Sequence, residues 1–114
     1  MGLTPQPATV VSKLGNPLMA KPFPYIVFYS LSYNEDSYTE LVAELRDRSV
    51  RWCHFIPGVW FVLRRETLVD LGQILRGYVL GNDRIVVMPA MGPADGLAPM
   101  EVWRWIAEYL PRMW

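Results

Sequence analysis

The feature of this sequence that most constrains its fold is the order in which strand-like and helix-like patterns follow one another. Four short runs rich in apolar residues are typical of strands; they cover residues 25–31, 50–55, 59–63 and 84–88. Two stretches carry apolar residues at helical spacing; they cover residues 37–49 and 68–78. The resulting order, βαββαβ, is that of the split-βαβ unit. The chain is therefore predicted to be an α+β protein with a ferredoxin-like fold.

The composition of the strands also predicts their order in the sheet. The run Val59–Leu63 is apolar throughout, which suits an interior strand, whereas the run at 50–55 mixes polar residues among apolar ones, which suits an edge. Between them, Pro57 and Gly58 supply the fixed φ and the positive φ of a type II turn, so the two runs form a hairpin. Right-handed crossovers then favour the antiparallel order 4-1-3-2, with both helices on one face.

Capping residues predict where the two helices begin and end. Ser37 and Glu40 stand at the spacing of a capping box, in which each side chain satisfies the other residue's backbone amide. In the second helix, Thr67 is the expected N-cap and Gly81 the expected C-cap.

The second face of the predicted sheet also needs a cover, because the runs at 25–31 and 59–63 do not alternate between apolar and polar residues. A C-terminal helix can supply part of it. Its expected apolar stripe is Trp103, Ile106, Ala107 and Leu110, and Pro111 ends it. A second copy of the chain is expected to cover the rest, since large exposed apolar patches are uncommon on monomers. We therefore predict a homodimer packed through sheet faces or edges.

Aromatic residues are the first candidates for that subunit contact. The chain has five Trp and six Tyr, and such side chains dominate the energetics of interfaces. The interface candidates are Tyr29, Trp52, Trp60 and Trp103. The alternative is a core that is simply rich in aromatic residues, and the sequence leaves both open.

Length and composition predict one domain at residues 25–114, preceded by a flexible, proline-rich lead-in at residues 1–24. The 114 residues, 52% of them hydrophobic and 19% charged, are enough to bury a single core. A lone cysteine, Cys53, excludes an internal disulfide and favours the reducing cytoplasm. No segment approaches the roughly 18 consecutive apolar residues of a membrane span, so no membrane partner is expected.

The net charge of zero argues against a strongly basic nucleic-acid surface. Contact with DNA or RNA would have to come from local arginines. The candidates are Arg46, Arg48, Arg51, Arg64 and Arg65. Cationic side chains at the end of a helix are also favourable without any ligand, so a plain surface role stays open for them.

The sequence contains no motif that identifies a catalytic site. Cys53 and His54 are adjacent, but adjacent strand residues point to opposite faces and cannot form a nucleophile–base pair. No zinc-ligand spacing is present. Asp36 and Asp83 are the catalytic candidates, although a helix start and a turn explain them equally well. We expect no metal and no cofactor.

Three segments nevertheless resemble one group of small proteins. They are Tyr25–Leu31, Trp52–Trp60 and Asn82–Val87. Over about residues 22–90 the chain resembles the CRISPR-associated Cas-two and VapD-like proteins, in particular their stand-alone, SinR-like bacterial relatives. The resemblance implies a ferredoxin-like homodimer. In the CRISPR-associated members it also implies a DNA-binding scaffold or a metal-dependent nuclease.

The resemblance marks one position where this chain departs from those nucleases. They carry an aspartate at the end of the first strand as the proposed metal ligand, and the matching residue here is Ser30. A serine hydroxyl is a poor ligand for a hard divalent cation. We therefore expect a non-catalytic, homodimeric Cas-two-like module, associated with nucleic acid or with a defence or toxin–antitoxin system.

Two alternatives stay open. One is a nuclease that uses Mg²⁺ or Mn²⁺ and recruits Glu35, Asp36 or Asp83 in place of the missing carboxylate. The other is a regulatory dimer that binds a small molecule or a protein, because a fold alone does not assign a function.

Overall fold

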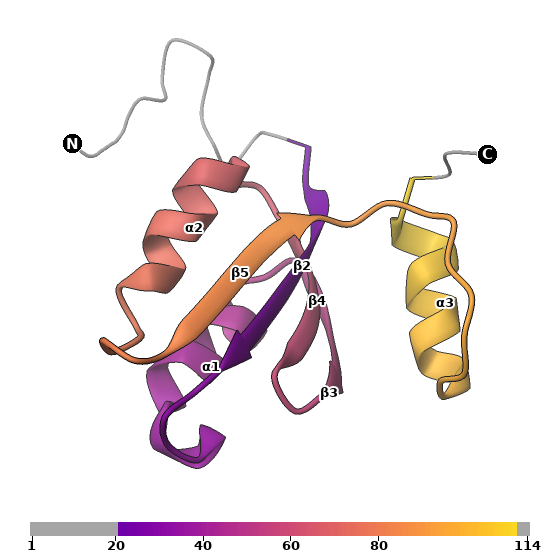
Figure 1. Cartoon of the computed structure of the whole chain (residues 1–114). Coiled ribbons are helices and arrows are strands. Elements are labelled where there is room, and N and C mark those ends of the chain that lie inside the picture. Colours follow the sequence, from indigo (N-terminus) through magenta and orange to yellow (C-terminus); the bar gives the residue numbers. More distant parts are fainter. Residues whose placement is uncertain (1–20, 112–114) are drawn as a thin grey trace, which may run out of the picture.

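The computed structural model describes residues 21–111, which form one four-stranded sheet, three α-helices and a 3₁₀ turn (Figure 1). The strands are β2 (Phe23–Ser30), β3 (Arg51–Ile56), β4 (Val59–Arg64) and β5 (Arg84–Pro89). The helices are η3 (Glu35–Ser37, the 3₁₀ turn), α1 (Thr39–Asp47), α2 (Leu68–Arg76) and α3 (Met100–Tyr109). Most of the predicted lead-in at residues 1–24 lies outside the described residues, and β2 already begins at Phe23.

The sheet order is β3-β4-β2-β5, and every neighbouring pair is antiparallel. This confirms the predicted 4-1-3-2 topology and the α+β, ferredoxin-like fold with an added C-terminal helix. The two most apolar strands, β2 and β4, lie in the middle, while β3 and β5 form the edges. The strands with a neighbouring strand on each side are therefore the most apolar, and the two edge strands are less so.

The hairpin between β3 and β4 turns at a glycine, as predicted. Gly58 has a φ of 84°, a value that residues with a Cβ rarely adopt. A Cβ at this position would also lie 2.8 Å from the carbonyl oxygen of Tyr29. The Tyr29 amide donates to the Gly58 carbonyl at 2.9 Å, so the turn is bonded to the adjacent β2.

Helices α1 and α2 cover the same face of the sheet, also as predicted (Figure 1). The core on this face joins buried residues of both helices to those of the central strands; they include Leu41, Leu45, Leu71, Leu75, Val27, Trp60 and Val62. Each fully buried side chain of this size contributes about 1.5–3 kcal/mol of hydrophobic free energy, against which its lost conformational entropy must be set.

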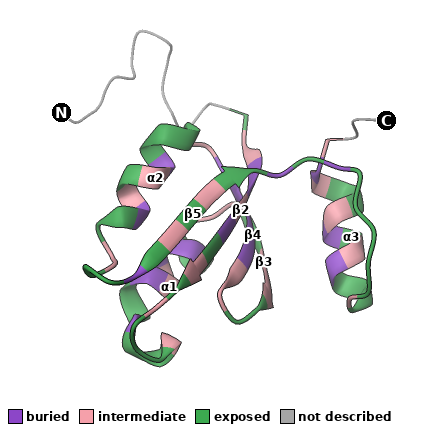
Figure 2. Ribbon diagram, in the orientation of Figure 1, coloured by how far each residue is buried: buried purple, intermediate pink, exposed green. Residues whose placement is uncertain are grey.

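Helix α3 packs on the opposite face, over the β3–β4 half of the sheet (Figure 1). Phe61 of β4 stacks on Trp105, with ring centroids 5.6 Å apart. The predicted cover by the C-terminal helix is therefore correct, and of the predicted stripe Ile106 and Leu110 pack on the sheet while Trp103 and Ala107 do not. The residues that face the sheet are Val102, Trp105, Ile106, Tyr109 and Leu110, whereas Trp103 is half-buried and Ala107 is exposed. Figure 2 shows that α3 carries both buried and exposed residues along its length. The charged residues Glu101, Arg104 and Glu108 are exposed on the other side of the helix.

The predicted capping box at the start of α1 does not form. Ser37 belongs to the separate turn η3, and α1 begins at Thr39 after Tyr38, which makes no side-chain cap. The local cap is instead made one turn earlier, where the Asn34 side chain accepts a hydrogen bond from the Asp36 amide at 2.8 Å. An Asx turn at Asn34 thus competes successfully with the capping box.

The predicted start of α2 is confirmed, but its predicted end is wrong. Thr67 accepts a hydrogen bond from the Asp70 amide at 3.2 Å and caps the helix. The C-cap is Gly77, whose amide donates to the Ile74 carbonyl at 3.1 Å, and not Gly81. Gly72 lies inside α2 without ending it, so the presence of a glycine alone does not locate the end of this helix.

Candidate functional site

Asp83, one of the two catalytic candidates, is committed to the loops around it. Its carboxylate accepts hydrogen bonds from the amides of Ser32 and Leu80, each at 2.7 Å, and from the Tyr38 hydroxyl at 3.0 Å. The hydrogen bond from the Leu80 amide, together with those from the Ser32 amide and the Tyr38 hydroxyl, holds the pKa of Asp83 below its ordinary value, although burial acts to raise this pKa. Asp83 therefore joins the loop after β2 to the loop before β5.

The other carboxylate candidates do not gather into a metal site. Asp36 is exposed in η3. Within residues 21–111, no group of three or more His, Cys, Asp or Glu side chains is arranged to hold a metal ion. Ser30, the position that matches the metal-binding aspartate, is exposed at the end of β2 and pairs with Arg84 across the sheet.

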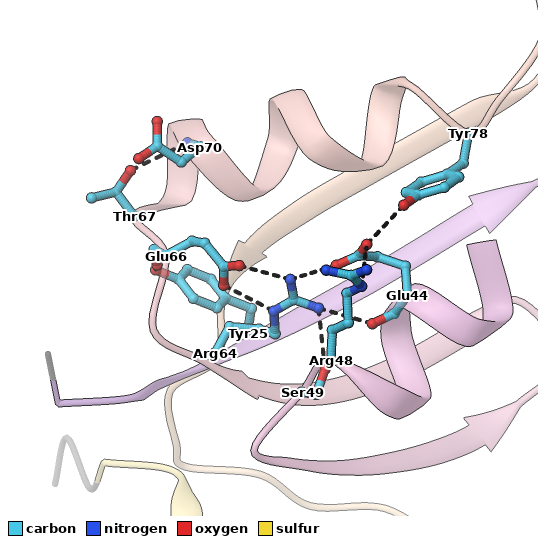
Figure 3. Close-up of polar contacts among 9 residues, drawn as sticks. All are labelled: Tyr25, Glu44, Arg48, Ser49, Arg64, Glu66, Thr67, Asp70 and Tyr78. Atoms are coloured by element: carbon cyan, nitrogen blue, oxygen red, sulfur yellow. Dashed lines mark hydrogen bonds and ion pairs between the residues drawn. The ribbon is translucent and has the colours of Figure 1, made fainter. Parts of the chain in front are cut away.

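Arg64 is buried at the centre of a polar network between β4, α1 and the loop before α2 (Figure 3). Its guanidinium donates to the Glu44 carboxylate at 2.7 Å, to the Glu44 carbonyl at 3.0 Å, and to both carboxylate oxygens of Glu66 at 2.8 and 2.9 Å. Tyr78 donates to the second Glu44 oxygen at 2.8 Å. With 1% of its side chain exposed, Arg64 is occupied by the fold and is not displayed to a nucleic acid.

The network also determines the charge states of its members. Burial by itself lowers the pKa of Arg64, but the hydrogen bonds and charges of Glu66 and Glu44 outweigh it and leave the pKa raised. For Glu66, burial acts to raise the pKa, and the bonds to Arg64 outweigh it and lower the pKa. Both partners are therefore held in their charged forms.

Three of the remaining arginine candidates are exposed close together, at the end of α1 and the start of β3. Arg46 forms an exposed ion pair with Asp47 at 2.8 Å, and Arg48 lies 3.7 Å from Glu44 with 74% of its side chain exposed. Arg51 donates to the carbonyl of Val50 next to it. Arg65 is half-buried. We call Arg46, Arg48 and Arg51 the arginine group.

A second polar cluster lies where β2, β3 and η3 meet. The Trp60 Nε1 donates to the Tyr29 hydroxyl at 2.9 Å, and that hydroxyl donates to the Glu35 carboxylate. His54 stacks on Trp60 with ring centroids 4.0 Å apart, and its Nε2 lies 3.5 Å from a Glu35 oxygen. Burial, followed by the Glu35 bond, raises the pKa of Tyr29, so its phenol stays protonated. The cluster connects η3 to the sheet.

Cys53 lies on the opposite face of β3 from His54, as predicted. It packs in the cluster under α3, while His54 packs on the Trp60 ring. Burial, together with the Glu101 carboxylate, raises the pKa of the Cys53 thiol. The reactive thiolate is therefore disfavoured at this position.

Of the four aromatic interface candidates, Trp52 is the one that is exposed. Trp60 is 1% exposed and lies in the core, Tyr29 is half-buried in the cluster described above, and Trp103 donates its Nε1 to the Ala98 carbonyl at 3.1 Å. Trp52, at 43% exposure, leans on Trp60 at the β3 edge.

The β2–β5 half of the second sheet face carries exposed apolar side chains that the sequence analysis did not single out. Phe28, Val86 and Met88 are 38%, 47% and 45% exposed. Phe28 and Val86 are direct partners across the two strands. We call these three residues the open sheet face, because α3 covers only the β3–β4 half.

No helix among residues 21–111 has both the length and the apolar character needed to cross a membrane.

No family model and no curated protein matches the chain. Among solved structures, the chain is similar to the crystal structure of a hypothetical protein from Thermus thermophilus, with a TM-score of 0.47 and 23% identity. The match covers 68% of this chain and 95% of the other.

Proposed function

We propose that the protein is a non-catalytic homodimeric module that associates with nucleic acid. The open sheet face is the observation that carries this proposal. It consists of apolar side chains that protrude from a central and an edge strand, on a face that the chain's own α3 leaves half uncovered. A second copy packed on the same residues would remove this surface from water, and a two-fold contact of this kind is the commonest form of homo-oligomer.

The arginine group supports the association with nucleic acid. Arg46, Arg48 and Arg51 are exposed within one short stretch; Arg46 and Arg51 make surface contacts, and Arg48 lies 3.7 Å from the buried Glu44 while 74% of its own side chain is exposed. Phosphate oxygens are the ligands that such groups bind best, with two parallel hydrogen bonds each. A two-fold dimer carries the group twice, so weak contacts on each protomer would add to a usable affinity.

The nuclease alternative has less support. Its strongest carboxylate, Asp83, uses its lone pairs on two backbone amides and a tyrosine hydroxyl, which leaves little capacity for a metal ion. The regulatory alternative stays open, and the pocket described in the next subsection favours a small-molecule form of it.

The dimer is tested with Val86→Asp, which places a charge at the centre of the open sheet face. Sedimentation over a wide range of concentrations should show a dimer for the wild type and a monomer for the variant. Val69→Asp is the control, because Val69 is also an exposed valine, at 65% against 47% for Val86, and lies on α2. A wild type that sediments as a monomer, or a Val69→Asp variant that dissociates as readily as Val86→Asp, contradicts the proposal.

Nucleic-acid binding is tested by fluorescence anisotropy with labelled DNA and RNA at several salt concentrations. Arg46→Glu and Arg51→Glu should each weaken binding and lower the salt slope by about 1, because each removes a phosphate contact. Arg104→Glu, on the exposed side of α3, is the control and should have little effect. Absence of binding at low salt would exclude the nucleic-acid association while leaving the dimer intact.

A further inference from the structure

A pocket of about 300 Å³ lies beside the start of α1, between residues of η3 and of the loop after α2. Its lining comes from the loop after β2, from the first turn of α1 and from the segment between α2 and β5. The lining residues are Tyr33, Ser37, Tyr38, Thr39, Glu40, Leu41, Tyr78 and Leu80. The volume is at the lower end of the range for small-molecule sites.

Three tyrosines and two leucines are among the eight residues that line the pocket. Tyr38 and Tyr78 bond their hydroxyls to Asp83 and to Glu44, so what they offer a ligand is mainly ring carbon. At the rim, Tyr33 and Leu80 are 65% and 61% exposed. Two large apolar side chains from different loops thus stand in water at the mouth of one pocket, where a ligand could bring them together.

The charge of the pocket is negative. Glu40 is exposed, and among residues 21–111 no hydrogen bond or ion pair engages its carboxylate. Of the residues that the structure describes, no Lys, Arg or His lines the pocket. The cation that acts on the pocket wall is Arg48, whose guanidinium lies 3.7 Å from Glu44 and whose charge reaches Tyr78.

The amino end of α1 works against this negative charge, but it is the weaker of the two effects. The first amides of a helix carry about half a positive charge, whereas Glu40 carries a full negative one in the same turn. The Glu40 carboxylate also acts on the pocket wall, where it contributes to the raised pKa of Tyr78 after the larger effects of the Glu44 bond, of burial and of the opposing Arg48 charge.

From these features we propose that the pocket binds an organic cation, namely a quaternary or alkylated ammonium group on a small apolar body. Such a group is attracted to the faces of aromatic rings and loses little hydration on entry. The tyrosine rings would surround its methyl groups, and Glu40 would supply the counter-charge. None of the three residues of the open sheet face or of the arginine group lines this pocket, and the proposal does not depend on dimerisation or on nucleic acid.

The test compares choline with 3,3-dimethyl-1-butanol, which has the same shape but no charge. Binding is followed by NMR titration of the full chain, with resonances of residues around α1 and the loop after α2 as the readout. Choline should bind at this site and roughly 3–30 times more tightly than the neutral compound, the range expected for a cation on aromatic rings. Equal affinity for both compounds, binding elsewhere, or no binding of choline at millimolar concentration overturns the proposal.

Two substitutions separate the roles of charge and ring. Glu40→Gln should lower the affinity for choline at least threefold and leave that for the neutral compound unchanged, while Glu108→Gln, on exposed α3, should change neither. Tyr33→Ala should weaken choline binding, and Tyr33→Phe should restore it because the ring is kept. Both positions are exposed, so the variants are expected to fold, which circular dichroism verifies. If sulfate rather than choline shifts these resonances, the site takes anions at the helix end and the proposal is wrong.

Discussion

Replacing Arg64 by methionine is the sharpest test of the buried network in Figure 3. Methionine keeps much of the length and the apolar stem of arginine but removes the guanidinium. Glu44, with 4% of its side chain exposed, would then be left as a buried carboxylate. Its remaining partners would be the Tyr78 hydroxyl at 2.8 Å and Arg48 at 3.7 Å, whose side chain is 74% exposed.

The cost can be worked out from this geometry. Removal of one partner of a buried ion pair typically destabilises a protein by about 3–5 kcal/mol, because the other charge stays behind without compensation. A domain of this size has about 5–15 kcal/mol of stability in total. With a urea m-value of about 1.5 kcal/mol/M, the midpoint of Arg64→Met should fall by roughly 2–3 M.

Urea unfolding followed by tryptophan fluorescence measures this loss, and two further variants test its origin. Glu66→Gln should cost much less, since the Glu66 side chain is 31% exposed and water replaces part of its bonding. Arg64→Met combined with Glu44→Leu should recover much of the stability, because an apolar pair needs no compensation. A loss below about 1 kcal/mol for Arg64→Met, or no recovery in the double variant, would refute this reasoning.

The network also predicts a pH dependence that disappears with Arg64. The pKa of Glu66 is lower in the folded chain than its ordinary value. The corresponding stability is therefore present above that ordinary value and is lost as the pH falls through the folded pKa. Arg64→Met should flatten this acid limb in a series of urea titrations from neutral to acidic pH.

Three further predictions concern the loops and α3. Gly58→Ala should cost about 1–3 kcal/mol in urea unfolding, because of the positive φ and the nearby carbonyl, whereas Gly81→Ala, with open space around it, should be neutral or slightly stabilising. Asp83→Ala should destabilise the chain at neutral pH but not in acid. The pKa of Asp83 is lowered in the folded chain, so the stabilisation from this carboxylate is lost as the pH falls through that pKa. Thermal unfolding at two pH values measures this difference. Trp105→Ala should cost about 3–5 kcal/mol and speed hydrogen exchange in α3. Trp105→Phe should cost far less, because the buried indole N–H that it removes has no partner among the described residues.

Much of the backbone arrangement follows from local patterns in the sequence. The unbroken apolar run at Val59–Leu63 predicted an interior strand, the mixed run before it predicted an edge, and Gly58 predicted the turn between them; the structure confirms all three. The helix boundaries were less accurate, because Ser37 and Gly81 had competitors a few residues away in Asn34 and Gly77. Capping signals act locally, so a nearby alternative can replace them without any change in topology.

The roles of the polar residues could not be predicted in the same way. Arg64, next to Arg65 at the end of a strand, resembled a surface pair, but Glu44 and Glu66 enclose it. Asp83 resembled an ordinary turn residue, yet it receives bonds from residues far away in the sequence. Glu35 and His54 carry no shared motif and meet only because η3 folds onto β3.

The sequence by itself determined the order of the elements, the sheet topology and the need for a cover on the second face. These properties depend on the period and the apolar content of short segments, which are local quantities. Only the tertiary structure decided which charged side chains are buried, that α3 covers only half of its face, and that Tyr33, Tyr78 and Glu40 line one pocket. Those outcomes depend on which distant residues meet when the helices dock on the sheet, and no local pattern encodes that encounter.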